Sequence, residues 1–142
     1  MSENPRIIVR PATANDLDAL TLRNYIPRER LARMVEQNQF AIAESNAMPI
    51  GYAGLDWLVA VHPFLAMIWV FEHYRRRGVG RALLRFLEDR CRELGFDELH
   101  SSSQLDEAEP QAWHRRMGFE ECGIIAGFNH GVGEIVFRKR LT

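Results

Sequence analysis

The chain has 142 residues, of which 46% are apolar and 26% are charged, and its formal net charge at pH 7 is −1. We expect residues 1–142 to form a single domain, because this length is typical of one domain. A charge near zero argues against a domain built mainly to bind nucleic acid. No run approaches about 18 consecutive apolar residues, so the sequence predicts no membrane-spanning helix.

The first residues do not show the basic and then apolar pattern of a secretory signal. The two cysteines, Cys91 and Cys122, follow no CxxC or metal-ligand spacing. Reduced thiols without a disulfide framework are typical of cytosolic proteins. We therefore expect a cytoplasmic protein with two reduced thiols and no metal site.

The first half of the chain alternates between strand and helix patterns. In chain order, these patterns predict a strand at 6–10, helices at 15–23 and from 27, and strands at 39–44, 50–59 and 64–71. Asn15 and Asp16 predict a helix cap, and Pro27 suits the first turn of the next helix. The strand at 64–71 is almost wholly apolar, as expected of a central strand covered on both faces.

The second half continues with the same alternation. The patterns predict a helix at about 78–94, a strand at 96–102, a helix at 107–117 and strands at 119–126 and 134–140. On the first of these helices, leucines and Cys91 form an apolar stripe, whereas Glu88, Asp89 and Arg92 are expected to face water. A strand that follows a connecting helix pairs in parallel with the strand before it, so we expect a mixed sheet.

A basic turn with two glycines joins the apolar strand to the helix at 78–94. It reads Arg75-Arg76-Arg77-Gly78-Val79-Gly80-Arg81. Glycines let a ligand approach the backbone closely, and the first amides of a helix have no partner within that helix. The helix dipole and the arginines add positive charge at the same place. The turn therefore predicts a site for a phosphate-bearing ligand, in particular a pyrophosphate.

Together with the element order, three features resemble the GCN5-related N-acetyltransferase superfamily. They are Val70 four residues before Tyr74, the turn Arg75-x-x-Gly78-x-Gly80, and the ending Trp113-His114-Arg115-Arg116-Met117-Gly118-Phe119 of the last predicted helix. The resemblance covers nearly the whole chain. It implies an α/β (α+β) fold with a mixed, mostly antiparallel sheet and helices on both faces.

The resemblance also implies acetyl-CoA as the cofactor. Backbone groups of Ile68, Trp69 and Val70 would align the thioester and the pantetheine arm, and amides of the turn would hold the pyrophosphate. Glu107 stands where the superfamily has an asparagine that contacts the pantetheine arm. The implied cofactor-binding residues are Ile68, Trp69, Val70, Arg75, Arg76, Arg77, Gly78, Val79, Gly80, Arg81, Glu107 and Trp113.

His114 stands where the superfamily has the tyrosine that donates a proton to the departing CoA thiolate. Histidine can do the same work, because its unperturbed pKa lies near about 6.5. We therefore expect His114 to be the general acid. The alternative is a helical histidine that only packs against the cofactor.

An attacking amine must be neutral, so direct transfer needs a base. We expect Glu72 first, because it lies nearest in sequence to the thioester end of the strand. Asp56 comes second, because a carboxylate among apolar neighbours has a raised pKa that suits a base. Glu44, His62 and a relay through ordered water remain alternatives.

The sequence thus predicts an N-acetyltransferase that moves an acetyl group from acetyl-CoA to a primary amine within a ternary complex. A CoA-binding sensor or scaffold without chemistry is the alternative, because His114 and Glu107 depart from the superfamily pattern. We expect a small-molecule acceptor before a protein, and neither nucleic acid nor membrane as a partner. Homodimer formation through an exposed last strand stays open.

Overall fold

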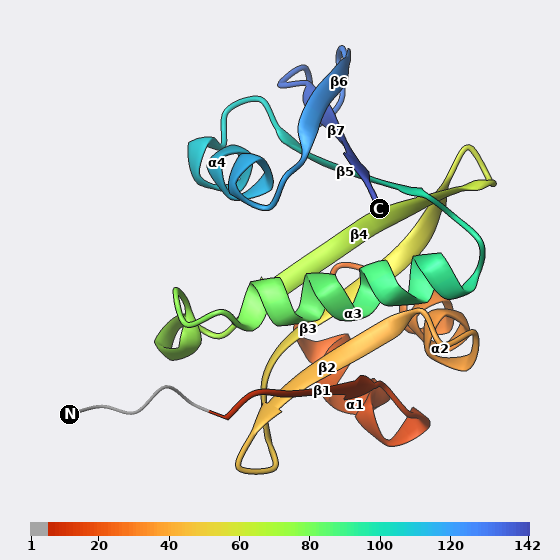
Figure 1. Ribbon diagram of the computed structural model, residues 1–142, viewed down its shortest axis with the longest axis vertical. Coiled ribbons are helices and arrows are strands. Elements are labelled where there is room, and N and C mark those ends of the chain that lie inside the picture. The colour runs from red at the N-terminus through yellow and green to blue at the C-terminus, as the bar shows by residue number, and fades with distance from the viewer. Residues whose placement is uncertain (1–5) are drawn as a thin grey trace. The chain divides into compact units, whose positions relative to one another are not determined.

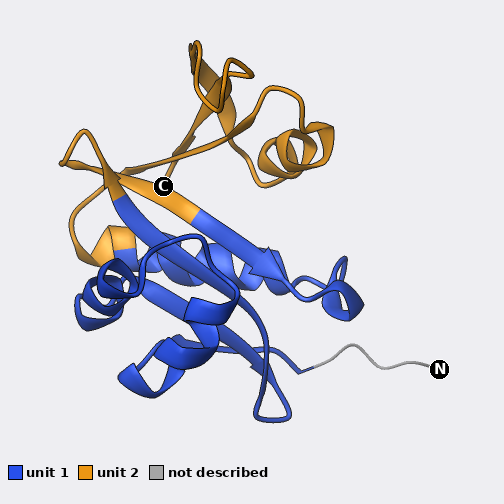
Figure 2. Cartoon of the chain, turned by 180° about the vertical axis from the view of Figure 1, so that it is seen from behind, with its two compact units in different colours: residues 1–56, 67–90 blue, residues 57–66, 91–142 orange. Residues whose placement is uncertain are grey.

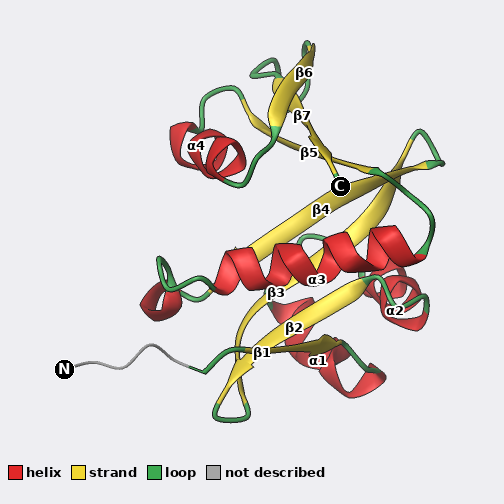
Figure 3. Cartoon of the chain, viewed as in Figure 1, coloured by secondary structure: helices red, strands yellow, loops and turns green. Residues whose placement is uncertain are grey.

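The computed structural model describes residues 6–142. This range includes the whole of the first strand predicted at 6–10. Seven strands form a sheet with the order β1-β2-β3-β4-β5-β7-β6 (Figures 1 and 3). The strands are β1 (Ile8–Pro11), β2 (Phe40–Ser45), β3 (Met48–Leu58), β4 (His62–Val70), β5 (Glu98–Gln104), β6 (Glu120–Ile125) and β7 (Glu134–Arg140). The helices are α1 (Leu17–Leu22), α2 (Arg28–Glu36), α3 (Val79–Glu93) and α4 (Ala108–Arg116).

The strand directions confirm the predicted mixed sheet. The pairs β1–β2, β2–β3, β5–β7 and β6–β7 are antiparallel. Strands β4 and β5 are parallel, with Phe64 opposite His100. No helix in residues 6–142 combines the length and the apolar character that crossing a membrane requires.

The chain divides into two compact units, Met1–Asp56 with Met67–Arg90 and Trp57–Ala66 with Cys91–Thr142, which we call unit 1 and unit 2 (Figure 2). The prediction of a single domain therefore stays a prediction.

Unit 1 places helices on both faces of its strands (Figure 1). On one face, Gly51 of β3 lies against Val79 and Leu83 of α3. On the other face, Gly54 of β3 lies against Phe40 and against Met34 of α2. Gly51 and Gly54 are an odd number of residues apart, so their Cα–H bonds point to opposite faces of the pleated strand. The missing side chains at these two positions let helices approach β3 from both sides.

Unit 2 is built from β5, β6, β7 and α4, together with the β3–β4 hairpin. Its buried apolar side chains include Leu99, Phe119, Ile135 and Phe137. Cys122 is exposed on β6, and the β6–β7 register shifts between Glu121 and Gly123. Cys91, by contrast, is fully buried, and no disulfide joins the two thiols.

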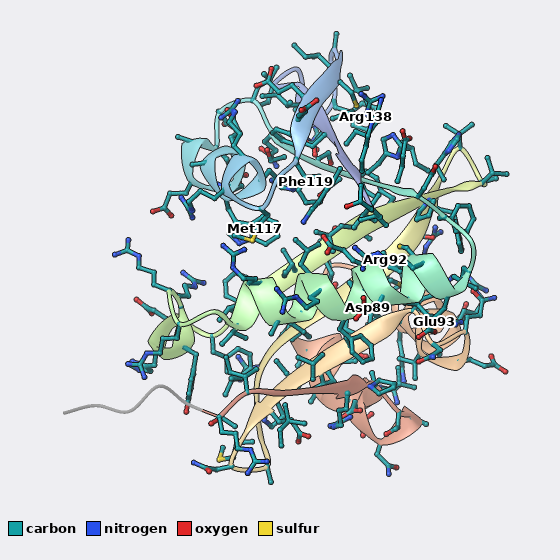
Figure 4. The ribbon with its side chains drawn as sticks, in the orientation of Figure 1. Asp89, Arg92, Glu93, Met117, Phe119 and Arg138 are labelled. Carbon is teal, nitrogen blue, oxygen red and sulfur yellow. The ribbon has the colours of Figure 1, made fainter. Side chains whose placement is uncertain are left out.

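Two sequence expectations on burial are corrected by the structure. Glu88, expected to face water, is 7% exposed, because it lies four residues after Leu84 and so on the buried side of α3. Asp89 and Arg92 are exposed as expected (Figure 4). Trp69 is 45% exposed although its strand was expected to be covered on both faces, because its indole ring lies under Arg75 and not in the core.

The Gly54→Ala substitution tests the close approach on the α2 face of β3. A Cβ at Gly54 would lie 2.7 Å from the Phe40 ring and 2.8 Å from the Met34 methyl group. We expect the free energy of unfolding to fall by about 1–3 kcal/mol, as for other overpacked cores. The control is Gly123→Ala on β6, where a Cβ meets nothing within 4 Å. Equal denaturant midpoints for the two variants would contradict this packing.

Candidate functional site

The N-terminal end of α3 presents unpaired backbone amides. The amide of Ala82 donates to the carbonyl of Gly78 at 3.0 Å, which is the first hydrogen bond of the helix. The amides of Val79, Gly80 and Arg81 precede that bond, so they point out of the end of the helix. The dipole of a 15-residue helix adds a positive partial charge at the same end. This end of α3 therefore attracts an anion.

The turn before α3 is shaped by residues with left-handed backbone conformations. Gly78 has a φ of 85° and Arg76 a φ of 63°. A Cβ at Gly78 would meet nothing within 4 Å, so the backbone there faces open space. Arg76, Arg77 and Arg81 are exposed around this space. An open, basic turn that leads into free helix amides fits a phosphate group.

Gly51 on β3 fixes this turn relative to β4. A Cβ at Gly51 would lie 2.8 Å from the carbonyl oxygen of Trp69, 3.2 Å from Val79 and 3.3 Å from Leu83. Any side chain larger than hydrogen would therefore push β4 and the start of α3 away from β3. The amide of Phe71 donates to Ile50 at 2.9 Å and extends the attachment to β3 beyond the end of β4.

Arg75 folds back onto β4. Its Nε donates to the carbonyl of Val70 at 2.9 Å, and its guanidinium lies 4.7 Å from the centre of the Trp69 ring. Arg75 is therefore held by the strand although it is exposed, and Arg76 and Arg77 are exposed in the turn without such a contact to β4. Ile68 and Val70 are half-buried. Unit 1 thus brings the predicted thioester-aligning strand and the predicted phosphate turn together.

The two predicted bases differ in their surroundings. Glu72 is exposed in a short 3-10 turn that spans Glu72–Tyr74, between β4 and the basic turn. Asp56, near the end of β3, is paired with Arg30 of α2, with its Oδ2 at 2.7 Å from Nη2 and 3.2 Å from Nε. Glu72 therefore keeps the more accessible carboxylate.

His114 lies buried in unit 2, with only 5% of its surface exposed. Its ring stacks on Phe137 at 4.5 Å between ring centres, and Trp113 and Phe119 approach edge-on at 5.1 and 5.2 Å. Met117 and Phe119 connect α4 to β6 (Figure 4). The histidine is thus enclosed by aromatic rings from α4, β7 and the α4–β6 connection.

Hydrogen bonds at both ring nitrogens fix the protonation of His114. Nδ1 lies 2.7 Å from the carbonyl of Pro110, and Nε2 lies 2.7 Å from the hydroxyl of Ser101. A carbonyl can only accept, so Nδ1 carries a proton. Burial lowers the pKa of His114 below its usual value, although the Pro110 carbonyl opposes this shift. The neutral ring therefore accepts the Ser101 proton at Nε2, and a proton must first be added there before His114 can act as an acid.

The other predicted residues of unit 2 surround the N-terminus and the middle of α4. Glu107 is exposed at the residue before the helix, and its amide donates to Gln104 at 3.2 Å. Trp113 is half-buried against the His114 ring. Sequence reasoning missed Ser101, because the run Ser101-Ser102-Ser103 gives no sign of which hydroxyl meets the histidine.

The chain is similar in sequence to known acetyltransferases. A model described as Acetyltransferase (GNAT) family matches residues 10–119. An aminoglycoside N(6')-acetyltransferase type 1 from Stenotrophomonas maltophilia is 40% identical over 65 residues, which cover 46% of this chain and 42% of the relative. One from Acinetobacter haemolyticus is 25% identical over 139 residues, covering 85% of this chain and 96% of the relative. The chain thus spans less than half of the length of the relative from Stenotrophomonas maltophilia.

Solved structures share the fold. A GNAT family acetyltransferase from Bacillus cereus ATCC 10987 has a TM-score of 0.80 at 21% identity, with 96% of this chain and 99% of that chain covered. One from Elizabethkingia anophelis, solved with acetyl-CoA bound, has a TM-score of 0.78 at 18% identity, with 99% and 100% covered. The ribosomal-protein-S18-alanine N-acetyltransferase from Escherichia coli has a TM-score of 0.78 at 20% identity, with 96% and 95% covered. The predicted fold class is confirmed.

Two serine variants test the hydrogen bonds around His114. Ser101→Ala leaves Nε2 of a buried histidine unpaired, so we expect the free energy of unfolding to fall by about 1–3 kcal/mol. Ser103 is also buried on β5, but among the described residues its hydroxyl has no hydrogen-bond partner. Ser103→Ala should therefore leave stability unchanged or raise it. Chemical denaturation measures both, and an equal loss in the two variants would contradict the Ser101–His114 bond.

Proposed function

Since the chain belongs to the acetyltransferase (GNAT) family, whose model matches residues 10–119, we propose that it transfers an acetyl group from acetyl-CoA to a primary amine. The acceptor is a small molecule, and the amine attacks directly while both substrates are bound. The observation that carries the proposal is the basic turn that opens into the unpaired amides of α3. Bound acetyl-CoA supplies an acetyl group activated as a thioester.

The pyrophosphate of the cofactor would bind at the N-terminal end of α3. The amides of Val79, Gly80 and Arg81 lie beyond the first helical hydrogen bond, and such amides favour phosphate oxygens. Arg76 and Arg77 are exposed beside them and would add full positive charges. The open space at Gly78 supports this assignment, because a phosphate needs close access to the backbone.

Backbone groups of Ile68, Trp69 and Val70 would align the thioester along the end of β4. An amide aimed at the carbonyl oxygen stabilises the negative charge that develops there. Gly51 supports this role because it lets β4 and the start of α3 approach the same point on β3. The strand and the phosphate turn would therefore act as one preorganised surface of unit 1.

We propose Glu72 as the group that accepts the proton of the amine, because its carboxylate is exposed beside the end of β4. Asp56 is the second candidate, although its carboxylate is bonded to Arg30. His114 would donate a proton to the departing sulfur. This role requires a proton on Nε2. In this structure Nε2 instead accepts the hydrogen bond of the Ser101 hydroxyl. Glu107 and Trp113 would contact the pantetheine arm.

We further propose that the protein acts in the cytoplasm. Neither of its two cysteines is in a disulfide, as is usual for proteins of reducing compartments. A protein acceptor ranks behind a small-molecule amine, because the curated relatives are named for aminoglycoside acetylation. The last strand of the chain, β7, lies between β5 and β6, so it is not the exposed strand that the sequence led us to expect. Homodimer formation through β6, the strand at this edge of the sheet, is a secondary proposal, since edge strands offer unpaired backbone groups.

Two experiments, thermal unfolding and then thiol release, test the proposed function. Acetyl-CoA and CoA should each raise the unfolding midpoint, since a hundredfold excess over Kd stabilises a protein by about 2.7 kcal/mol. NAD and a DNA duplex should not. Thiol release from acetyl-CoA in the presence of a panel of amines then measures turnover. Stabilisation without thiol release would favour a CoA-binding sensor, and absence of both would reject the proposal.

Two glycines with matching backbone conformations separate cofactor binding from backbone strain. Gly78 has a φ of 85° and Gly95 a φ of 88°, and a Cβ at either would meet nothing within 4 Å. Alanine at either position is strained by about 1 kcal/mol or more, but only Gly78 lies in the phosphate turn. We expect Gly78→Ala to weaken acetyl-CoA binding measured by calorimetry, whereas Gly95→Ala should bind as the wild type does. Equal affinities for the two variants would remove Gly78 from the site.

A further inference from the structure

Two arginines stack on two aromatic side chains at the end of β4. The guanidinium of Arg75 lies 4.7 Å from the ring centre of Trp69, and that of Arg23 lies 4.7 Å from the ring centre of Phe71. Trp69 and Phe71 are two residues apart in an extended segment, so their side chains point to the same side. We call these four residues the arginine strip. All of them belong to unit 1.

The connection between α1 and α2 lies along this side of β4. The hydroxyl of Tyr52 donates to the carbonyl of Arg23 at 2.8 Å, and Nδ2 of Asn24 lies 2.7 Å from the sulfur of Met67 on β4. These contacts attach the connection to β3 and β4. The arginine strip therefore borders the stretch of β4 that is proposed to align the thioester, on the side that the α1–α2 connection flanks.

Two carboxylates of unit 1 are paired with arginines outside the strip. Asp18 is paired with Arg28 at 2.7 Å and Asp56 with Arg30 at 2.7 Å. Within residues 6–142, neither Arg23 nor Arg75 has a carboxylate within ion-pair distance. Nε of Arg75 is bound by the Val70 carbonyl, which leaves its terminal nitrogens to meet a ligand. Glu72 is the one acidic residue on the adjoining turn, and it is the proposed base.

We propose that the acceptor is a small amine that also carries a carboxylate, which Arg23 and Arg75 bind. This inference rests on the proposed function and narrows its substrate class. A guanidinium offers paired donors that match a carboxylate, and stacking on an aromatic ring holds it in place. Two positive charges repel a polycation such as an aminoglycoside, so the acceptor differs in charge from the compounds for which the curated relatives are named.

Exposed apolar side chains beside the strip add to the acceptor's description. Leu22 is 87% exposed and Tyr25 is 79% exposed, and both flank Arg23 and Asn24 in the chain. Trp69 is 45% exposed within the strip itself. Contiguous exposed apolar patches often mark ligand sites, and these three side chains belong to the strip or to the residues next to Arg23 in the chain. An acceptor with an apolar body, an amine and a carboxylate satisfies all of these features, so an aromatic amino acid is a suitable probe.

A matched pair of amines tests the carboxylate. L-Phenylalanine and L-phenylalaninamide differ only at the carboxyl group, and kanamycin serves as the polycation. We expect kcat/KM for L-phenylalanine to exceed that for the amide by about tenfold, the scale of a hydrogen-bonded charge. The amine of the amide is the weaker base and is more often neutral, so amine protonation cannot produce this preference. Equal values, or a preference for kanamycin, would overturn the inference.

Variants of Arg23 locate the effect. Arg23→Gln should reduce the preference for L-phenylalanine over the amide about tenfold, chiefly through KM, and Arg23→Lys should retain part of it. Arg33→Gln, an exposed position on α2 that is not part of the strip, is the control and should keep the wild-type ratio. Arg75→Gln should act in the same direction as Arg23→Gln. An unchanged ratio in both glutamine variants would also overturn the inference.

Binding provides a second readout that does not depend on turnover. N-acetyl-L-phenylalanine, the expected product, should bind the wild type in calorimetry and bind Arg23→Gln about tenfold more weakly. If Arg23→Gln fails to fold, the amine pair and the product titration on the wild type decide the matter. Thermal stabilisation by acetyl-CoA separates the two levels. Stabilisation by acetyl-CoA together with a preference for kanamycin would reject only the inference that the acceptor carries a carboxylate. Absence of that stabilisation would reject the proposed function itself.

Discussion

The missing side chain of Gly51 is the constraint on which the arrangement of unit 1 depends. The Trp69 carbonyl, Val79 and Leu83 all come within 3.3 Å of the place where a Cβ would stand. The end of β4 and the start of α3 therefore both approach the same point on β3. Because α3 begins there, its unpaired amides and the open turn at Gly78 have a fixed position relative to the strand. The position of the helix end that attracts an anion thus depends on the packing at Gly51, which involves no charged side chain.

Main-chain and side-chain groups divide the work in unit 1. The amides of α3 and the strand end are backbone features, set by glycines and by hydrogen bonds to β3. The arginine strip, in contrast, consists of side chains held by ring stacking and by the Val70 carbonyl. Substitutions in the strip can therefore change charge and shape without moving the backbone of the turn. Donor binding and acceptor preference are separable properties under the proposed function.

The sequence predicted those parts that local patterns encode. The leucine stripe of α3 has helical spacing, and the glycine turn before it has an intrinsic backbone preference, so both were found. The order of elements and the mixed sheet followed from the same patterns. The burial of Glu88 was missed because one turn of helix separates it from Leu84 and the apolar stripe is wider than its leucines alone suggest.

The side-chain geometry of the candidate site required the fold. Arg75 was read as part of the phosphate turn, and only its contacts with Val70 and Trp69 reveal that it folds back. His114 was identified by its position before Gly118-Phe119, but its neutral state depends on Ser101 and on the Pro110 carbonyl. The two thiols carry a last consequence. Cys91 is fully buried, and Cys122 is exposed where the β6–β7 register shifts. A thiol-reactive fluorophore would therefore label the native protein at Cys122 alone, in unit 2.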